Sequence, residues 1–474
     1  MKINNDNVRK TLESAKTMLA KEKNISPALL AVLNLLLVFM QAMLDRFSLN
    51  SKNSSKSPST DLNRRKKINR KNSSKRKPGG QKGRLGKQLK PTPNPDRIET
   101  INIDKRSLPK GNYIDGGFEA RQVVDFDISV TITEYRAQIL INTHGDRYVA
   151  EFPSFVTRPI QYGPKTKTTS VYMSQYQLTP YNRIEDYFHE QAGLNISVGS
   201  VFNFNQEAYV KLEQFEKIAK EKLISSSTIN ADETGINING KRMWLHTACN
   251  EKWTHFFAHK KRGKEAMDAI GILPKFTGTL CHDHWKPYYR YHCKHGLCNA
   301  HHLRELEWCA TEDKQKWALA MKKFLIRVNE KVTASGGKLT PLKCKYYRKE
   351  YNKILSDAEK ECRSPDINRR PGQRGRIKKT KSRNLLERLS QYQDDILRFM
   401  YDAHVPFTNN QGENDLRMTK VQQKISGCFR SEEGALIFCR IRGYLITCRK
   451  HGVSATNALE TLFEGKLPDF VNSS

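Results

Sequence analysis

Hydrophobic residues recur at two periods along the chain, one typical of helices and one typical of strands. The longest helical run extends from Ile25 to Leu44, has no charged residue, and repeats its large apolar side chains at three- and four-residue steps. Ser26 and Pro27 are a favourable cap and first residue for this helix. Its length could just span a bilayer, but two amides interrupt it and no second span follows. We therefore expect a helical segment over residues 1–48 that oligomerises or packs on its own domain, without membrane insertion.

Alternation of apolar and polar residues begins near Arg97 and continues to Pro159. It is most regular over residues 123–132, and Gly pairs and Asp-containing turns separate the runs. Period-two alternation is typical of strands that bury one face. We expect a small β-rich module over residues 96–160.

The period becomes helical again from Tyr162. Two short helical stretches, residues 183–191 and 197–202, are joined by a turn that contains Gly193. Such a pair within residues 161–225 is either a helix-turn-helix that binds DNA or an ordinary helical hairpin.

After Ser227 the pattern predicts an α/β domain. Asn239-Gly240 is a strong hairpin signal between two alternating runs. The predicted order is three strands, a helix and a fourth strand, at residues 228–238, 242–248, 253–258, 264–270 and 278–282. Three meandering strands, a helix and a returning strand are the beginning of a ribonuclease H-like sheet. We expect a ribonuclease H-like catalytic core over residues 226–455.

Two acids occupy neighbouring strands of that sheet. Asp232 lies in the first strand and Asp283 directly follows the fourth, and these strands are adjacent in the ribonuclease H-like order. Two close carboxylates repel one another unless they are protonated or bridged by a cation, and hard oxygen ligands suit Mg²⁺ or Mn²⁺. The sequence therefore predicts a site for two metal ions that supports phosphoryl displacement.

A third acid is expected from a helix packed on the sheet. Glu413 is the best candidate, because Arg417, Lys420 and Lys424 follow it on the same helical face and could hold a DNA backbone against the metals. The alternative is an exposed helix with an ordinary Glu–Arg pair. Asp415 points to a different face, so we prefer Glu413.

Charge indicates the class of partner. The 474 residues include 82 Lys and Arg against 49 Asp and Glu, a net charge of +33, and 37% hydrophobic residues, which excludes a wholly disordered chain. Residues 49–95 form a basic flexible arm, with fifteen cations against the one acid Asp61 between residues 51 and 90. The arm is either a solvated linker or a DNA-binding segment with Arg64, Arg65, Lys66, Lys67, Arg76 and Lys77.

All ten cysteines lie between Cys249 and Cys448, which indicates a reduced, cytoplasmic protein. Nine Cys and His residues are concentrated within residues 281–302, and Cys298 and His301 have a short ligand spacing. The set has no clean four-ligand pattern, so we do not expect structural zinc. We expect Cys298 and His301 at a strand-to-helix junction near the active site, where they pack or orient it.

More than one hundred residues separate His301 from Glu413, which is more than one core helix requires. We expect a helical insertion at about residues 313–403. It contains a basic loop, residues 363–383, that is either solvated or a second contact with DNA. Residues 456–474 are expected to form a C-terminal tail.

Several ordered motifs carry a resemblance that covers most of the chain. They are Ser48 to Asp61, Lys77 to Gly83, Asp232-Glu233-Thr234, Asp283 with Trp285 and Tyr288, Cys298 to His301, Asn409-Asn410 with Glu413 and Arg417, Ser426 to Ser431, and Thr447 to Lys450. From near Leu44 to the C-terminus the chain resembles transposases of the IS66 family. Many members have cysteine pairs that bind zinc before the catalytic domain, whereas this chain has no cysteine before Cys249, so zinc is not carried over there.

The resemblance implies a DDE transposase whose catalytic metal ligands are Asp232, Asp283 and Glu413. Its substrates would be the terminal inverted repeats of an insertion sequence and target double-stranded DNA, with cleavage by water followed by attack of the freed 3′-hydroxyl. The spacing from Glu413 to Lys420 resembles an acid and lysine pairing in which the lysine contacts DNA. A homo-oligomer, small accessory proteins of the same element and a bacterial, nucleoid-associated location are also implied. The alternatives are a catalytically silent DNA-binding descendant of a transposase and a ribonuclease H-like nuclease.

Overall fold

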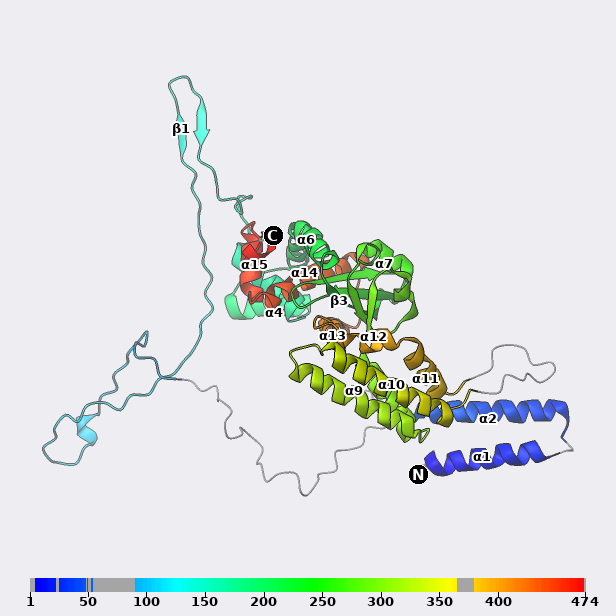
Figure 1. Cartoon of the computed structure of the whole chain (residues 1–474). Helices are drawn as coiled ribbons and strands as arrows, with labels where there is room; N and C mark the ends of the chain where they lie inside the picture. Colours follow the sequence, from blue (N-terminus) through cyan, green and yellow to red (C-terminus); the bar gives the residue numbers. More distant parts are fainter. Residues whose placement is uncertain are drawn as a thin grey trace. The chain divides into compact units, whose positions relative to one another are not determined.

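The chain divides into two units, one of residues 1–64 with 134–474 and the other of residues 65–133. The structure, a computed structural model shown in Figure 1, describes residues 5–22, 25–47, 49, 53, 90–364 and 379–472. Most of the predicted basic arm lies outside these residues, including Arg64, Arg65, Lys66, Lys67, Arg76 and Lys77.

Two helices form the N-terminal segment, α1 (Asn5–Lys21) and α2 (Pro27–Phe47), and they contact one another (Figure 1). The predicted cap of α2 is present, because Ser26 Oγ accepts the N–H of Leu29 at 3.3 Å. The outer face of α2 is apolar and uncovered, with Leu35 71% and Phe39 62% exposed. By length and composition α2 could cross a membrane, which is weak evidence because core helices and signal sequences pass the same test.

Residues 96–160 contain much less sheet than their alternation predicts. Strands β1 (Ile139–Ile141) and β2 (Arg147–Val149) form a short antiparallel hairpin, and the rest of this described range has no strand. Val123 is 85% and Phe126 is 87% exposed. Alternation stabilises a sheet only where one face is buried, and nothing covers these residues here. The structure thus corrects the expected β-rich module to a single hairpin.

Four helices directly before the central sheet share its core. They are α3 (Pro164–Val171), which continues as a π-helical turn (Tyr172–Tyr176), α4 (Tyr181–Ala192), α5 (Val198–Lys211) and α6 (Glu213–Ile224). The two predicted helices are present as α4 and α5. Gly193 ends α4 in the left-handed conformation (φ 61°), and Ser197 caps α5 by accepting the N–H of Ser200. Because these helices and the sheet bury one common core, the structure shows no boundary at residue 225.

The central sheet is mixed. Its strands are β3 (Thr228–Ile238), β4 (Lys241–Cys249), β5 (Thr254–His259), β6 (Thr279–His282) and β7 (Lys294–Leu297). The spatial order is β5-β4-β3-β6-β7, with β3, β4 and β5 antiparallel in turn and β6 and β7 parallel to β3. A mixed five-stranded sheet of this order, surrounded by helices, is consistent with a ribonuclease H-like domain.

The four predicted strands and the predicted helix α7 (Lys264–Ile270) are all present. Asn239 and Gly240 both have positive φ (45° and 77°), as a tight two-residue hairpin requires. Strand β7 was expected only as the strand before the junction at Cys298, without a residue range. It is four residues long and includes Gly296, a composition that gives little strand signal.

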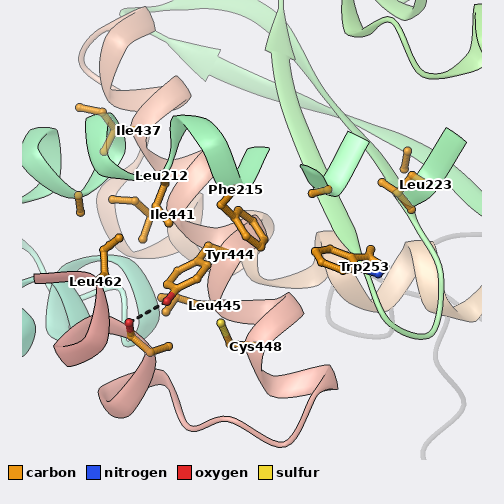
Figure 2. Packing of buried hydrophobic residues seen from close by; sticks show 14 of the residues in the cluster. Leu212, Phe215, Leu223, Trp253, Ile437, Ile441, Tyr444, Leu445, Cys448 and Leu462 are labelled. Atoms are coloured by element: carbon orange, nitrogen blue, oxygen red, sulfur yellow. Dashed lines mark hydrogen bonds between the residues drawn. The ribbon is translucent and has the colours of Figure 1, made fainter. Parts of the chain in front are cut away.

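Helix α14 (Glu432–Lys450) packs against β5 and α5, and α15 (Ala455–Phe463) packs against α3. Figure 2 shows the resulting core, in which Phe215 meets Tyr444 edge to face at 5.0 Å between ring centroids. The Tyr444 hydroxyl donates to the Ala458 carbonyl at 2.7 Å. The expected C-terminal tail is therefore part of the core. A last short helix, α16 (Asp469–Asn472), follows.

The expected insertion is helical, and its buried core also includes Cys281 of β6 and Leu297 of β7. Helix α8 (Asn299–Thr311) precedes it, and the helices of the expected range are α9 (Lys316–Ala334), α10 (Pro341–Glu361), α11 (Lys381–Gln391) and α12 (Gln393–Leu397). Residues 365–378, most of the predicted basic loop, lie outside the described residues. Arg383 at the end of that loop is buried and pairs with Glu359 and Glu387, so this cation is structural.

Helix α13 (Asn410–Ser426) packs on β3 and β4. The side chain of Asp415, on the buried face of α13, fixes the position of this helix. Its Oδ2 accepts from Lys450 Nζ and from Thr254 Oγ1, both at 2.8 Å, and the side chains of Asp415 and Lys450 are only 8% and 11% exposed. A buried charge pair of this kind is costly to break because the remaining charge is uncompensated.

We expect Asp415→Ala to lower the free energy of unfolding by about 3 kcal/mol, because the buried Lys450 keeps its hydrogen bonds to Asn250 and Thr254 but loses the carboxylate that compensates its charge. Glu213→Ala is the matched control, since it breaks the Glu213–Lys217 pair, whose side chains are 60% and 62% exposed. The control should cost at most about 1 kcal/mol. Urea unfolding curves of the full chain measure both values, and equal losses would show that the buried pair is not important for stability.

Candidate active site

The parallel register of β3 and β6 sets two acids side by side, Asp232 in the middle of β3 and Asp283 directly after the carboxyl end of β6. Asn230 pairs with Cys281, so Asp232 and Asp283 each lie two residues beyond the same pair. Both carboxylates are also held by local backbone groups. Asp232 Oδ1 accepts the N–H of Glu233 at 2.9 Å, and Asp283 Oδ1 accepts the N–H of Trp285 at 3.0 Å.

Glu413 reaches the same place from the first turn of α13. Asn409, the residue before that helix, donates through Nδ2 to the Ala231 carbonyl at 2.9 Å and accepts through Oδ1 from Asn230 at 2.7 Å. The approach is close, because a Cβ at Gly412 would lie 3.4 Å from the Asp232 Cβ. The structure therefore brings the three predicted acids together.

Burial, followed by repulsion from Glu233 and Asp283, raises the pKa of Asp232 from 3.8 to about 8. Glu413 adds to this repulsion. In addition, Glu413 Oε1 is buried and has no hydrogen-bond partner. A bound divalent cation would relieve both costs, and carboxylate oxygens are the ligands that Mg²⁺ and Mn²⁺ prefer. The residues present thus fit such ions.

Glu233 directly follows Asp232 in β3, and successive residues of a strand point to opposite faces of the sheet. Its side chain is only 1% exposed. Glu233 Oε1 accepts two hydrogen bonds from Arg262, at 2.6 and 2.9 Å, and Oε2 accepts one from the Tyr288 hydroxyl at 2.6 Å. Through these bonds Glu233 fixes the residues beside the acids.

Arg262 also belongs to a stack of alternating cations and indoles. Its guanidinium lies 4.8 Å from the ring centre of Trp244 and 4.3 Å from that of Trp285, and Arg242 lies 5.1 Å from Trp244. We call Arg242, Trp244, Arg262 and Trp285 the arginine–tryptophan ladder. The ladder adjoins the acids, because the Arg262 guanidinium donates to Glu233 and the backbone N–H of Trp285 donates to Asp283.

Comparison with known proteins shows to which family the chain belongs. The family model described as "Transposase IS66 family" matches residues 159–436, more than half of the chain. The chain belongs to the IS66 transposase family. Catalysis by DDE transposases of this kind typically uses divalent metal ions.

Two further similarities cover smaller parts of this transposase. A family of unknown function (DUF6444) matches residues 6–90. The "Uncharacterized protein y4jO" of Sinorhizobium fredii (strain NBRC 101917 / NGR234) is 37% identical over 70 residues. That stretch is 15% of this chain and 22% of the relative, so only about a fifth of the relative's length is matched.

The three predicted DNA contacts of the transposase on α13, namely Arg417, Lys420 and Lys424, are exposed. Lys420 Nζ donates to the Gly235 carbonyl at 2.8 Å, which holds it near the ladder. Although Lys420 is exposed at the surface, partial desolvation of its ammonium group lowers the pKa of Lys420 from 10.5. The sequence places Asp415 on a different face of α13 from Glu413, and in the structure its side chain is buried.

The cluster of Cys and His residues is divided among several environments. His282 and His295 are buried and share a hydrogen bond at 3.1 Å, and the buried His302 bonds Asn299. Cys298 directly follows β7 and precedes α8, which is the strand-to-helix junction that the sequence predicts.

Sequence reasoning missed three members of the site, namely Glu233, Arg262 and Trp244. Glu233 could have been noticed as the buried neighbour of Asp232 within a quoted motif. Arg262 and Trp244 gave no signal, because their role depends on strand pairing. Trp285 and Tyr288 were noted only through the family resemblance.

We expect the metal-free chain to lose stability as pH rises from about 4 to about 8. The folded state keeps a proton on Asp232 (pKa about 8) that the unfolded state, with its ordinary pKa of 3.8, has released, so deprotonation favours unfolding. Relative to Asp232→Asn, the free energy of unfolding of the native chain should fall by at least about 1–2 kcal/mol. Millimolar Mg²⁺ should reverse the loss only in the native chain. Parallel pH curves for the two proteins in a chelator would contradict this expectation.

Proposed function

We propose that this chain binds the terminal inverted repeats of an insertion sequence and catalyses metal-dependent DNA cleavage and strand transfer. The catalytic domain would be ribonuclease H-like, with Asp232, Asp283 and Glu413 as the DDE acids. The observation that carries this proposal is that these three acids lie close together in a chain of a transposase family. Two of them come from the parallel strands β3 and β6, and the third comes from α13, which Asn409 holds against β3.

In this mechanism the three carboxylates would hold two divalent ions. When bound, these ions supply positive charge that activates the attacking oxygen and stabilises the leaving oxygen of a phosphoryl displacement. The chain itself provides no nucleophile. Water attacks in the cleavage step, and the freed 3′-hydroxyl attacks target DNA in the transfer step. The protein's contribution is to orient the acids, since Asn409 fixes the position of α13 and Trp285 holds Asp283.

The cations around the acids would hold the DNA. Arg417, Lys420 and Lys424 extend along α13 from Glu413, and each can neutralise a phosphate. The arginine–tryptophan ladder offers planar cations and ring faces directly beside the acids, a combination that suits phosphates and unpaired bases. The basic arm over residues 49–95 would add affinity that does not depend on sequence.

Two element ends must be held together, which requires at least a dimer. The uncovered apolar face of α2 is the natural interface for a second copy, because a large exposed apolar face is costly in water. Small accessory proteins of the same element are further expected partners.

We expect Asp232→Asn to lower strand transfer of labelled terminal repeats by at least about 100-fold while DNA retention stays nearly unchanged. Glu251→Gln, which removes an exposed acid in a turn away from the site, is the matched control. Joined product from the native chain supports a transposase. Hydrolysis without joining would indicate a nuclease, and a metal-independent gel shift without either product would indicate a silent DNA-binding protein.

The α13 cations give a separate prediction for affinity. The double variant Arg417→Ala with Lys424→Ala should reduce the slope of log affinity against log salt by up to about 2, since each phosphate contact contributes about 0.9. Lys345→Ala with Lys349→Ala, a pair of exposed lysines on α10, should leave the slope unchanged. A fluorescence anisotropy titration at several salt concentrations measures this, and equal slopes for both variants would remove α13 from the DNA interface.

A further inference from the structure

Three soft and borderline ligands meet beside the acidic centre. Cys298, His301 and Glu413 each offer one ligand atom, and these atoms all lie within 4.8 Å of one another. Cys298 and His301 come from the junction before α8 and its first turn, and Glu413 comes from α13, more than one hundred residues later. Cys298 and His301 are close together in the sequence, whereas Glu413 is distant from both. For this reason the Cys and His residues alone form no complete ligand set.

Two of these atoms lack any other partner. His301 Nδ1 and Glu413 Oε1 are buried without a hydrogen bond, and they are 4.0 Å apart, too far for a direct one. Buried polar atoms without partners are costly. A cation between them would satisfy both atoms at once.

The third atom is prepared for a metal by its surroundings. Cys298 is buried, and its Sγ accepts the N–H of Asn409 at 3.1 Å. A backbone N–H that bonds a sulfur is a typical outer contact of a metal thiolate. Cys298 also occupies the cap position of α8. Burial raises the pKa of its thiol, so a bound cation would have to displace the proton.

We propose that Cys298, His301 and Glu413 bind a transition-metal ion of the zinc class, in a site adjacent to the centre of Asp232 and Asp283. Thiolate and imidazole ligands favour such an ion over Mg²⁺. Tetrahedral zinc would require ligand atoms about 3.3–3.8 Å apart, so small side-chain adjustments from the observed arrangement suffice. The fourth position is open to water.

This ion would do more than join two helices. Coordination through Oε1 leaves Oε2 of Glu413 for the neighbouring acidic centre. The orientation of Glu413 would then be fixed from the side of α8. The site stands on these three residues and does not depend on strand transfer being the reaction.

Cobalt(II) is the probe, because a cobalt–thiolate bond has a charge-transfer absorption in the near ultraviolet. The metal-free full chain is titrated with Co²⁺ in excess Mg²⁺. We expect one tight equivalent with this absorption, displaced by one equivalent of Zn²⁺. Cys298→Ser should abolish the band, and His301→Gln and Glu413→Gln should weaken binding by at least about tenfold, since even outer contacts are worth that much.

Two variants are controls. Cys428→Ser removes a partly buried thiol elsewhere on the chain and should leave the band unchanged. Asp232→Asn should also keep the band while it abolishes strand transfer, so failure of the metal site and failure of the proposed reaction are distinguishable. No band, or an unchanged band in Cys298→Ser, overturns the proposal. If Cys298→Ser does not fold, His301→Gln decides, because its side chain is 27% exposed and its folding can be checked by circular dichroism.

Discussion

The parallel pairing of β3 with β6 is the constraint on which the site depends. It aligns Asn230 with Cys281 and thereby fixes Asp232 and Asp283 at one level of the sheet. Burial is the main reason why the pKa of Asp232 is raised, and the charges of Glu233 and of Asp283, which the pairing holds nearby, raise it further. The sheet can bear the cost of burying these acids because its hydrogen bonds and core are formed elsewhere.

Neutral and cationic groups hold the elements around these charges. Asn409 joins α13 to β3 through two hydrogen bonds, one to the Ala231 carbonyl and one from the Asn230 side chain, and donates its own N–H to Cys298. Arg262 compensates Glu233 and stacks between two indoles. Each of these side chains contacts two elements, so the positions of α13, α8 and the strand ends depend on one another.

The sequence predicted the elements of the catalytic region well because their signals are local. Alternation, the Asn239-Gly240 turn and the caps at Ser26 and Ser197 require only neighbouring residues, and all are present. Alternation failed over residues 123–132, where the pattern is regular but no second layer covers it. The three acids came from spacing and family resemblance. The roles of Glu233, Arg262 and Trp244 could not be predicted, because their contacts join side chains that are distant in the sequence.

Helix α14 has a consequence for how the molecule is made. It packs directly on β5 and α5, and α15 covers α3, so the core of the sheet contains side chains from beyond residue 432. During synthesis the strands emerge from the ribosome long before the helices that bury them. The catalytic unit can therefore complete its folding only after nearly the whole chain has been translated. A premature stop before α14 would release an exposed, aggregation-prone sheet, and would leave intact only those N-terminal segments that need no part of it.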